Sequence, residues 1–412
     1  MEESIKWIVN PKARNEDNIK RPGPDFLGGK AAAETRNFME SFPQYEVTPL
    51  RNLGRLAAYT GIAGIYVKDE SYRFGLNSFK VLGGGHAIGR YLAGKLNLSP
   101  LNFSYAKLRS DEAREKLGEI TFTSATDGNH GRGVAWAARQ LGHRAVINMP
   151  KGSSPIRLEH ITATGAEGYI TDVNYDETVR ITAENANKNG WVVIQDTAWE
   201  GYEDIPNWII QGYTVMADEA YKQIQQYGFN RPTHIFIQAG VGSLAAAVLG
   251  FFASMFNNIR PVTVIVEPDK ADCFYKSALA GDGIPRYVTG DLDTIMAGLA
   301  CGEPNPFAWD ILKDMADMFI SCPDYISAKG MRILGNPLSG DTRVISGESG
   351  AVTTGMLVEL LLNEELAEAR EGLKLDQDSR VLVFSTEGDT DPEMYRKIVW
   401  DGAYPVPGKS HI

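Results

Sequence analysis

The 412-residue sequence has only three cysteines, no long apolar segment and no excess of basic residues. The cysteines are scattered and form no array with the spacing of a zinc site, so we expect neither a disulfide framework nor a bound metal. No run of eighteen apolar residues predicts a transmembrane helix, and the N-terminus lacks the apolar core of a secretory signal. The formal net charge of -11 argues against a nucleic-acid partner. A cytoplasmic protein is the default expectation.

From about residue 60, short segments rich in Val and Ile alternate with helical patterns and Gly-rich turns. This alternation predicts an α/β fold of mostly parallel sheets with helices on both faces. The length suits two domains. We expect a large domain made of residues 1–88 and 200–412 and a smaller inserted α/β domain at 89–199. The clearest expected strands are 64–70, 119–125, 233–238 and 379–388.

Four of the expected strand-to-helix turns carry unusual residues, at 77–85, 124–131, 239–244 and 385–391. In open parallel sheets, ligands bind beyond the carboxyl ends of the strands. We therefore expect these turns, which are far apart in the sequence, to contribute to one site.

The segment NSFKVLGGG places Lys80 just inside a helix start, where Asn77 and Ser78 supply capping groups. Because a helix N-terminus is already positive, we expect a depressed pKa for Lys80 and a more nucleophilic amine. The alternative is an ordinary surface lysine in a first helical turn.

The segment QAGVGSL contains Gly240, Val241, Gly242 and Ser243 at the start of another expected helix. Glycines allow close approach, and a helix N-terminus offers free N–H groups, so this turn is a candidate phosphate site. It matches neither the P-loop nor the dinucleotide-binding pattern. A turn that serves packing alone remains the alternative.

The segment TSATDGNHG gathers Ser124, Thr126, Asp127 and Asn129 at a helix start. An acidic residue there is commonly the N-cap, and this is the ordinary interpretation of Asp127. The cap does not explain the other small polar groups. His130 is expected to pack or to form a local hydrogen bond.

The last strand ends on Ser385 and Thr386, and a hydroxyl there can share a hydrogen bond with a ring nitrogen; a solvated turn is the alternative. Together, the four segments resemble the fold-type II pyridoxal-phosphate enzymes, the group of tryptophan synthase β, threonine deaminase and serine racemase. The resemblance implies pyridoxal 5′-phosphate as cofactor, with a Schiff base at Lys80 and the ring nitrogen against Ser385. It also implies that Asn129 holds the 3′-oxygen and that residues 240–243 hold the phosphate.

Strings such as VKDESYRFGLNSFK, QDTAWEGY and STEGDTD are similar to those of the diaminopropionate ammonia-lyases within this group. That resemblance implies elimination of ammonia from D- and L-2,3-diaminopropionate, which yields pyruvate and a second ammonia, by a homodimer. Lys80 would be the base for the L form and Asp127 for the D form, with Ser124 and Thr126 binding the substrate. Asp196 would face the second, cationic amine, which needs an anionic partner when buried.

Dehydratases of the group have a small residue in place of Asp127, so a serine/threonine dehydratase is the nearest alternative function. A nicotinamide-dependent dehydrogenase shares the fold class but requires a glycine pattern that this sequence lacks. A non-catalytic protein of the same fold is the third alternative. Cys273 and Cys301 could pair across a loop, although free thiols are favoured in a cytosolic protein.

Overall fold

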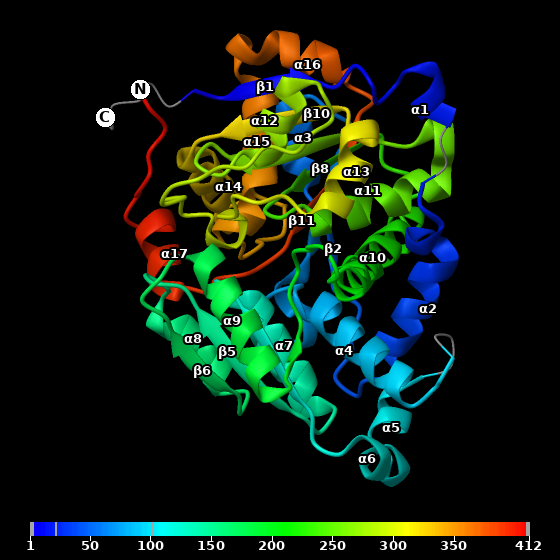
Figure 1. Ribbon diagram of the computed structural model, residues 1–412. Coiled ribbons are helices and arrows are strands. Elements are labelled where there is room, and N and C mark those ends of the chain that lie inside the picture. The colour runs from blue at the N-terminus through cyan, green and yellow to red at the C-terminus, as the bar shows by residue number, and fades with distance from the viewer. Residues whose placement is uncertain (1–3, 21–22, 100–102, 409–412) are drawn as a thin grey trace. The chain divides into compact units, whose positions relative to one another are not determined.

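The computed structural model describes residues 4–20, 23–99 and 103–408. The chain forms two compact units, each with its own sheet (Figure 1). The first unit comprises Met1–Gly28, Thr48–Tyr72 and Met216–Ile412, and the second comprises Gly29–Val47 and Arg73–Val215.

The first unit contains a seven-stranded sheet in the order β1-β10-β9-β8-β11-β3-β2. The central strands are parallel, whereas β1 and β2 pair antiparallel at the two edges. The strands in this spatial order are β1 (Lys6–Val9), β10 (Met318–Cys322), β9 (Val262–Pro268), β8 (His234–Gln238), β11 (Arg380–Ser385), β3 (Gly64–Asp69) and β2 (Leu50–Asn52).

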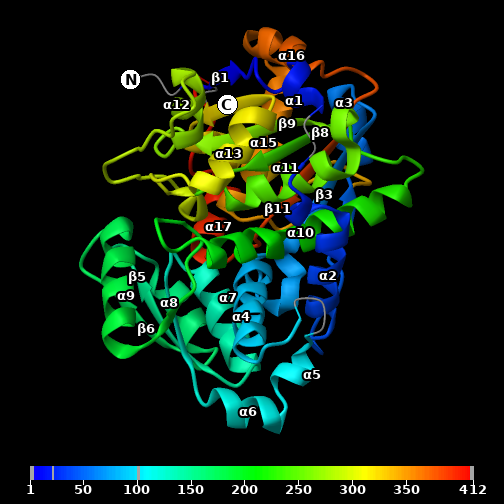
Figure 2. The same ribbon diagram turned by 45° about the vertical axis from the view of Figure 1, so that its right-hand side comes forward.

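Helices cover both faces of this sheet. Phe236, Val381 and Val383 share one hydrophobic core with residues of α14 (Asp324–Gly335) and α15 (Glu348–Leu362). Neighbouring strand residues such as Ile235, Ile237 and Leu382 point to the other face of the sheet and are also buried. On that face, α11 (Ser243–Phe256) packs on β8 (Figure 2). The remaining helices of this unit are α1 (Glu16–Lys20), α3 (Gly54–Thr60), α12 (Cys273–Ala280), α13 (Pro306–Met315), α16 (Ala367–Leu373) and α17 (Pro392–Val399).

The second unit contains a four-stranded parallel sheet in the order β6-β5-β4-β7. On β5, Ile147 lies against Gly131 of α7, while the next residue, Asn148, donates a hydrogen bond to Thr182 of α9. Since neighbouring strand residues point to opposite faces, α7 and α9 cover opposite faces of this sheet. The bounds are β4 (Thr121–Ala125), α7 (Asn129–Gln140), β5 (Arg144–Met149), β6 (Glu167–Ile170), α9 (Tyr175–Asn189) and β7 (Val192–Val193).

Further helices of this unit are α2 (Gly29–Glu40), α4 (Val81–Lys95), α5 (Tyr105–Leu108), α6 (Asp111–Leu117) and α8 (Pro155–Thr162). The long helix α10 (Asp204–Gln225) begins in the second unit and ends in the first. Within the second unit, α4 packs along α7, and α2 packs on α4.

The predicted fold class is confirmed: both sheets are mostly or wholly parallel, and helices cover them. The unit boundaries differ from the expected 89–199, because residues 29–47, 73–88 and 200–215 also fall in the second unit. The physical reason is helix packing: α2 and α4 are connected in sequence to strands of the first unit, but α4 buries its apolar side against α7, and α2 packs on α4. Sequence periodicity cannot show which partner a helix selects.

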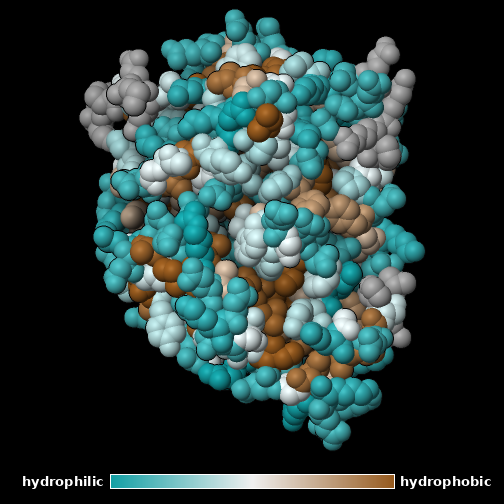
Figure 3. All heavy atoms as spheres, viewed as in Figure 1, coloured by the Kyte–Doolittle hydropathy of each residue, from teal (hydrophilic) through white to brown (hydrophobic). Residues whose placement is uncertain are grey.

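In the space-filling view, hydrophilic residues cover most of the face and apolar residues form separate areas (Figure 3). In the described part of the chain, no helix has both the length and the apolar character needed to cross a membrane. Among the same residues, no group of three or more His, Cys, Asp and Glu side chains is arranged to hold a metal ion.

Candidate active site

Lys80 forms a buried ion pair with Asp196 in the second unit. Lys80 is the N-cap residue of α4, and its Nζ lies 2.8 Å from Oδ2 of Asp196. The two side chains are only 15% and 7% exposed. Burial lowers the pKa of Lys80, but the opposing charge of Asp196, followed by Tyr213 and Asp127, raises the pKa above its ordinary value. The depressed pKa expected from the helix N-terminus was therefore wrong, because a carboxylate distant in sequence outweighs the helix dipole.

The same pair determines the charge of Asp196. Burial alone would raise the pKa of this carboxyl, but the charges of Lys80 and His130 and the hydrogen bond from Lys80 lower it to about 2. Asp196 therefore stays ionised throughout the physiological pH range.

Close backbone packing sets the position of Lys80. A Cβ on Gly133 of α7 would lie 2.8 Å from the backbone nitrogen of Val81, so only glycine lets the two helices approach this closely. The expected capping by Ser78 was wrong, because the N-cap residue is Lys80 and the buried Ser78 hydroxyl has no partner among the described residues. Asn77 adopts a left-handed conformation with φ of 59°.

The turn between β4 and α7 is held by Thr126. Its hydroxyl oxygen accepts hydrogen bonds from the backbone N–H groups of Gly128, at 2.9 Å, and Gly131, at 3.0 Å. The N-cap residue of α7 is Gly128 rather than Asp127. The interpretation of Asp127 as a helix cap was therefore wrong, because Thr126 satisfies the first turn.

Asp127 pairs instead with Arg157 of α8. One oxygen of the half-buried Asp127 carboxylate lies 3.4 Å from Nη1 of Arg157, whose side chain is buried. The sequence did not single out Arg157, which stands in the first turn of its helix and has the pattern of a solvated residue.

Gln195 links the turn to the segment that carries Asp196. Its side-chain oxygen accepts hydrogen bonds from the Ser124 hydroxyl, at 3.1 Å, and from the backbone N–H of Ala125, at 3.0 Å. Its amide nitrogen donates to the hydroxyl of Tyr175 at 2.8 Å. Gln195 was not a candidate in the sequence, since a single glutamine after a strand carries no distinctive signal.

His130 and Asn129 are both buried in the first turn of α7. The His130 Nε2 lies 2.8 Å from the carbonyl oxygen of Ile194, which confirms the expected local hydrogen bond. Burial lowers the pKa of His130, so the ring is neutral near pH 7.

Tyr213 of α10 also lies close to Lys80, although the sequence gave no sign of it. Its ring centroid is 4.7 Å from that of Phe79, the residue before Lys80. The side chain is buried, and burial raises the pKa of the phenol, which is therefore neutral. We refer to Lys80, Asp127, His130, Asp196 and Tyr213 as the lysine cluster.

In the first unit, the turn after β8 leads into α11 through Gly240, Val241, Gly242 and Ser243. Gly242 has φ of 91°, a left-handed conformation, and a Cβ there would collide with the ring of Phe274. No side chain caps this 14-residue helix, so its first N–H groups and its positive end remain suited to an anion. Asn305, which the sequence did not reveal, holds the turn by donating its backbone N–H to the Val241 carbonyl at 2.8 Å.

Ser385 ends β11, the strand next to β8. Its hydroxyl lies 2.8 Å from the hydroxyl of Ser346, and both residues are buried. The neighbouring Thr386 hydroxyl accepts a hydrogen bond from the amide of Gln238 at 2.9 Å. Because Gln238 ends β8 and Ser385 ends the neighbouring parallel strand, the turn 239–244 and Ser385 lie at the same edge of the sheet. This agrees with the expectation that the turns at 239–244 and 385–391 lie close together.

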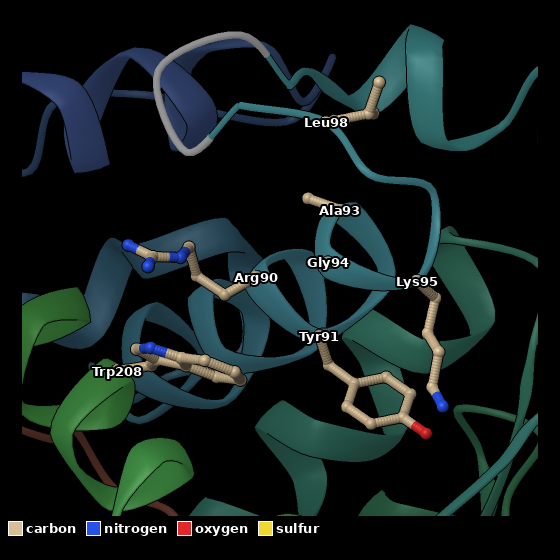
Figure 4. Close-up of a pocket in the computed structure, with 7 residues that line it drawn as sticks. All are labelled: Arg90, Tyr91, Ala93, Gly94, Lys95, Leu98 and Trp208. Carbon is tan, nitrogen blue, oxygen red and sulfur yellow. The ribbon is translucent and has the colours of Figure 1, made fainter.

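A separate pocket of about 280 Å³ in the second unit contains none of the expected site residues. Arg90 lies over the Trp208 ring, 5.4 Å from its centroid, and Lys95 lies 5.5 Å from the ring centroid of Tyr91 (Figure 4). Both cations are thus already placed against aromatic rings of the pocket wall.

The chain is similar to known proteins over most of its length. A family model described as pyridoxal-phosphate dependent enzyme matches residues 42–386. The chain belongs to this family.

Among pyridoxal-phosphate-dependent enzymes, the chain is 49% identical to a diaminopropionate ammonia-lyase of Salmonella typhimurium, over 98% of this chain and 99% of the relative. It is 51% identical to that of Escherichia coli strain K12, over 90% and 92%. A crystal structure of the Escherichia coli lyase in complex with D-serine matches with a TM-score of 0.90 at 46% identity and covers 98% of both chains. The predicted cofactor, pyridoxal phosphate, and the predicted fold type II are thus confirmed.

The chain's own residues fit this cofactor. An amine reacts with its aldehyde, an uncapped helix N-terminus suits its phosphate, and a buried hydroxyl suits its ring nitrogen. Lys80, the turn 240–243 and Ser385 supply these three groups.

Proposed function

We propose that the protein is a carbon–nitrogen lyase that eliminates one ammonia from 2,3-diaminopropionate, after which one water hydrolyses the released aminoacrylate to pyruvate and a second ammonia. The observation that carries this proposal is the pair of carboxylates in the lysine cluster. Asp196 contacts Lys80 at 2.8 Å, and Asp127 is near enough for its charge to raise the pKa of the lysine. The similarity of the whole chain to diaminopropionate ammonia-lyases supports the same conclusion.

Charge explains why two carboxylates suit this substrate. Diaminopropionate carries a second amine on its β-carbon, which enters the site as an ammonium. Removing an ammonium from water costs several kcal/mol (about 2–5) unless an anion pairs with it. Serine and threonine carry a neutral hydroxyl at that position. A hydroxyl cannot balance the negative charge of a second carboxylate beside Lys80.

We assign each cofactor-holding residue in turn. Lys80 would hold pyridoxal phosphate covalently through Nζ, and Asn129 would contact its 3′-oxygen. The residues of the turn 240–243 would hold its phosphate, and Ser385 its ring nitrogen. We choose Ser385 over Thr386 because the segment STEGD resembles the terminal strand that places a serine against the ring nitrogen in this group. When bound, the cofactor supplies an electron sink for the charge that develops at Cα.

The protein's own groups would move the protons. We propose that Lys80 removes the Cα proton of the L form and Asp127 that of the D form. Asp196 stabilises the ammonium that Lys80 becomes after it accepts a proton, because its pKa of about 2 keeps it charged. Asp196 would also hold the β-amine of the substrate, and Ser124 and Thr126 would bind the substrate at the β4–α7 turn.

We further propose that the protein is a cytoplasmic homodimer. It binds small amino acids as substrates and binds neither nucleic acid nor a membrane. The resemblance to the lyases supports the dimer. The formal net charge of -11 supports the absence of a nucleic-acid partner.

The test is to incubate the purified holoenzyme with D- and L-2,3-diaminopropionate, L-serine and L-threonine in parallel and to measure ammonia and 2-oxo acid. We expect two ammonia per pyruvate from diaminopropionate and a kcat/KM at least ~100-fold higher than for the hydroxy amino acids. Faster turnover of serine or threonine would instead identify the protein as a dehydratase.

A further inference from the structure

The Tyr213 hydroxyl is a buried polar group that the protein itself does not satisfy. The side chain is 1% exposed, and its hydroxyl has no hydrogen-bond partner among the residues that the structure describes. A buried hydroxyl without a partner destabilises the folded state, and a phenylalanine of the same shape would avoid that cost. A partner that comes from outside the chain would explain why a tyrosine stands here.

The packing of the Tyr213 ring fixes where that partner would lie. The ring contacts Phe79, one residue before Lys80, with centroids 4.7 Å apart. It also fills the space beside Gly83, where a Cβ would lie 2.5 Å from Cε1 and 2.7 Å from Cζ of the tyrosine. Cζ carries the hydroxyl, so the rigid ring holds the oxygen at the start of α4, where Lys80 emerges.

The surroundings favour a cationic partner. Asp196 contacts the Lys80 amine. Burial is the largest cause that raises the pKa of the Tyr213 phenol; the charge of Lys80 lowers that pKa, and the charges of Asp196 and Asp127 raise it, so two carboxylates and one ammonium act on the hydroxyl. Two carboxylates repel an anionic ligand group, such as a carboxylate or a phosphate. The neutral phenol oxygen retains lone pairs that accept a hydrogen bond from an ammonium.

We propose that the Tyr213 hydroxyl accepts a hydrogen bond from the β-ammonium of the substrate, so that Tyr213 is a further substrate-binding residue. This inference rests on the proposed function, because the β-nitrogen is the group that distinguishes diaminopropionate from other amino acids. Tyr213 would then recognise the leaving group together with Asp196.

The experiment compares two ligands in the Tyr213→Phe holoenzyme, which keeps the ring and removes only the oxygen. One ligand is diaminopropionate, assayed by kcat/KM. The other is alanine, the same amino acid without the β-nitrogen, whose affinity is measured by the change it produces in the absorbance of the bound cofactor. Tyr221→Phe on the same helix is the control, because its ring packs on Phe251 and Phe256, away from the lysine cluster.

We expect Tyr213→Phe to lower kcat/KM for diaminopropionate by about 10- to 100-fold, mainly through KM, and to change the alanine affinity less than ~2-fold. The control should match the wild type with both ligands. If Tyr213→Phe weakened alanine binding by the same factor as it lowered kcat/KM for diaminopropionate, the proposal would be overturned. Such a result would mean that the hydroxyl supports folding or contacts the cofactor rather than the β-ammonium. Unchanged kinetics with diaminopropionate would overturn it as well. If the wild type released no ammonia from diaminopropionate, the proposed function itself would fail, and this inference with it.

Discussion

Replacing Asp196 by asparagine tests the central ion pair, since it removes one charge and keeps the shape of the side chain. The pKa of Asp196 falls from an ordinary 3.8 to about 2. At about 1.4 kcal/mol per pKa step, this corresponds to about 2.5 kcal/mol of stability at neutral pH. The variant also leaves the buried Lys80 ammonium without its anion, which costs about 3–5 kcal/mol in comparable buried pairs. The two figures describe the same interaction, so we expect a loss of about 2.5–5 kcal/mol.

The assay is urea unfolding of the cofactor-free protein at pH 7, where Lys80 carries its own charge. Glu112→Gln is the matched control in the same unit, because Glu112 and Lys116 form an ion pair at 2.7 Å with both side chains exposed. No measurable change is expected there. A loss below ~0.5 kcal/mol for Asp196→Asn would refute the argument that burial makes the Lys80 pair strong.

The Lys80–Asp196 pair also predicts how the free energy of unfolding changes with pH. Because the folded-state pKa of Asp196 is lower than the unfolded one, its contribution to stability is complete above about pH 4 and disappears as the pH falls toward 2. The difference in unfolding free energy between the wild type and Asp196→Asn should therefore shrink across that window. A difference that stayed constant down to pH 2 would contradict this assignment.

Three further predictions concern the cofactor and the β4–α7 turn. Lys80→Ala should abolish the Schiff-base absorbance and the activity of the enzyme, and an unchanged spectrum would remove Lys80 from its proposed role. Asp127→Asn should lower kcat/KM for D-diaminopropionate by about 100-fold or more and for the L form by less than ~10-fold; equal losses would exclude it as the D-side base. Thr126→Val should destabilise the fold by about 1–2 kcal/mol in urea unfolding, with Thr126→Ser near the wild type, because only the hydroxyl accepts from Gly128 and Gly131.

The sequence predicted the elements that position the site better than the contacts within it. The strands at 64–70 and 233–238 agree with β3 and β8 to within a residue, because short runs of Val, Ile and aromatic residues between turns are local signals. The strand β10 and the helices α14 and α15 were not singled out, although they form much of the first unit's core. β10 and most of α15 are buried on all sides, which hides a periodic pattern, whereas α14 is amphipathic and carries Lys329 and Arg332 on its less buried side.

In the candidate active site, too, the sequence predicted individual residues better than the contacts between them. Lys80, Asp127 and Asp196 were identified through motifs, but their partners were not. The contact between Asp127 and Arg157 joins residues 30 apart, and the pair of Lys80 with Asp196 joins residues 116 apart. Local rules assigned a cap to Asp127 and a depressed pKa to Lys80, and both inferences failed because a tertiary neighbour changed the outcome.

The capping of α7 by Thr126 has a consequence for how the enzyme can be altered. Since Thr126 accepts from the backbone N–H groups of Gly128 and Gly131, the side chain at position 127 is not needed to cap the helix, and its contact within the fold is the ion pair with Arg157. Asparagine at position 127 keeps the shape of the side chain and an oxygen that can face the buried Arg157, whereas alanine removes that contact. The residue that caps the helix and the residue proposed to act on the substrate are thus adjacent but separate, so conservative changes at position 127 are a natural starting point for redirecting the enzyme toward amino acids with a neutral leaving group.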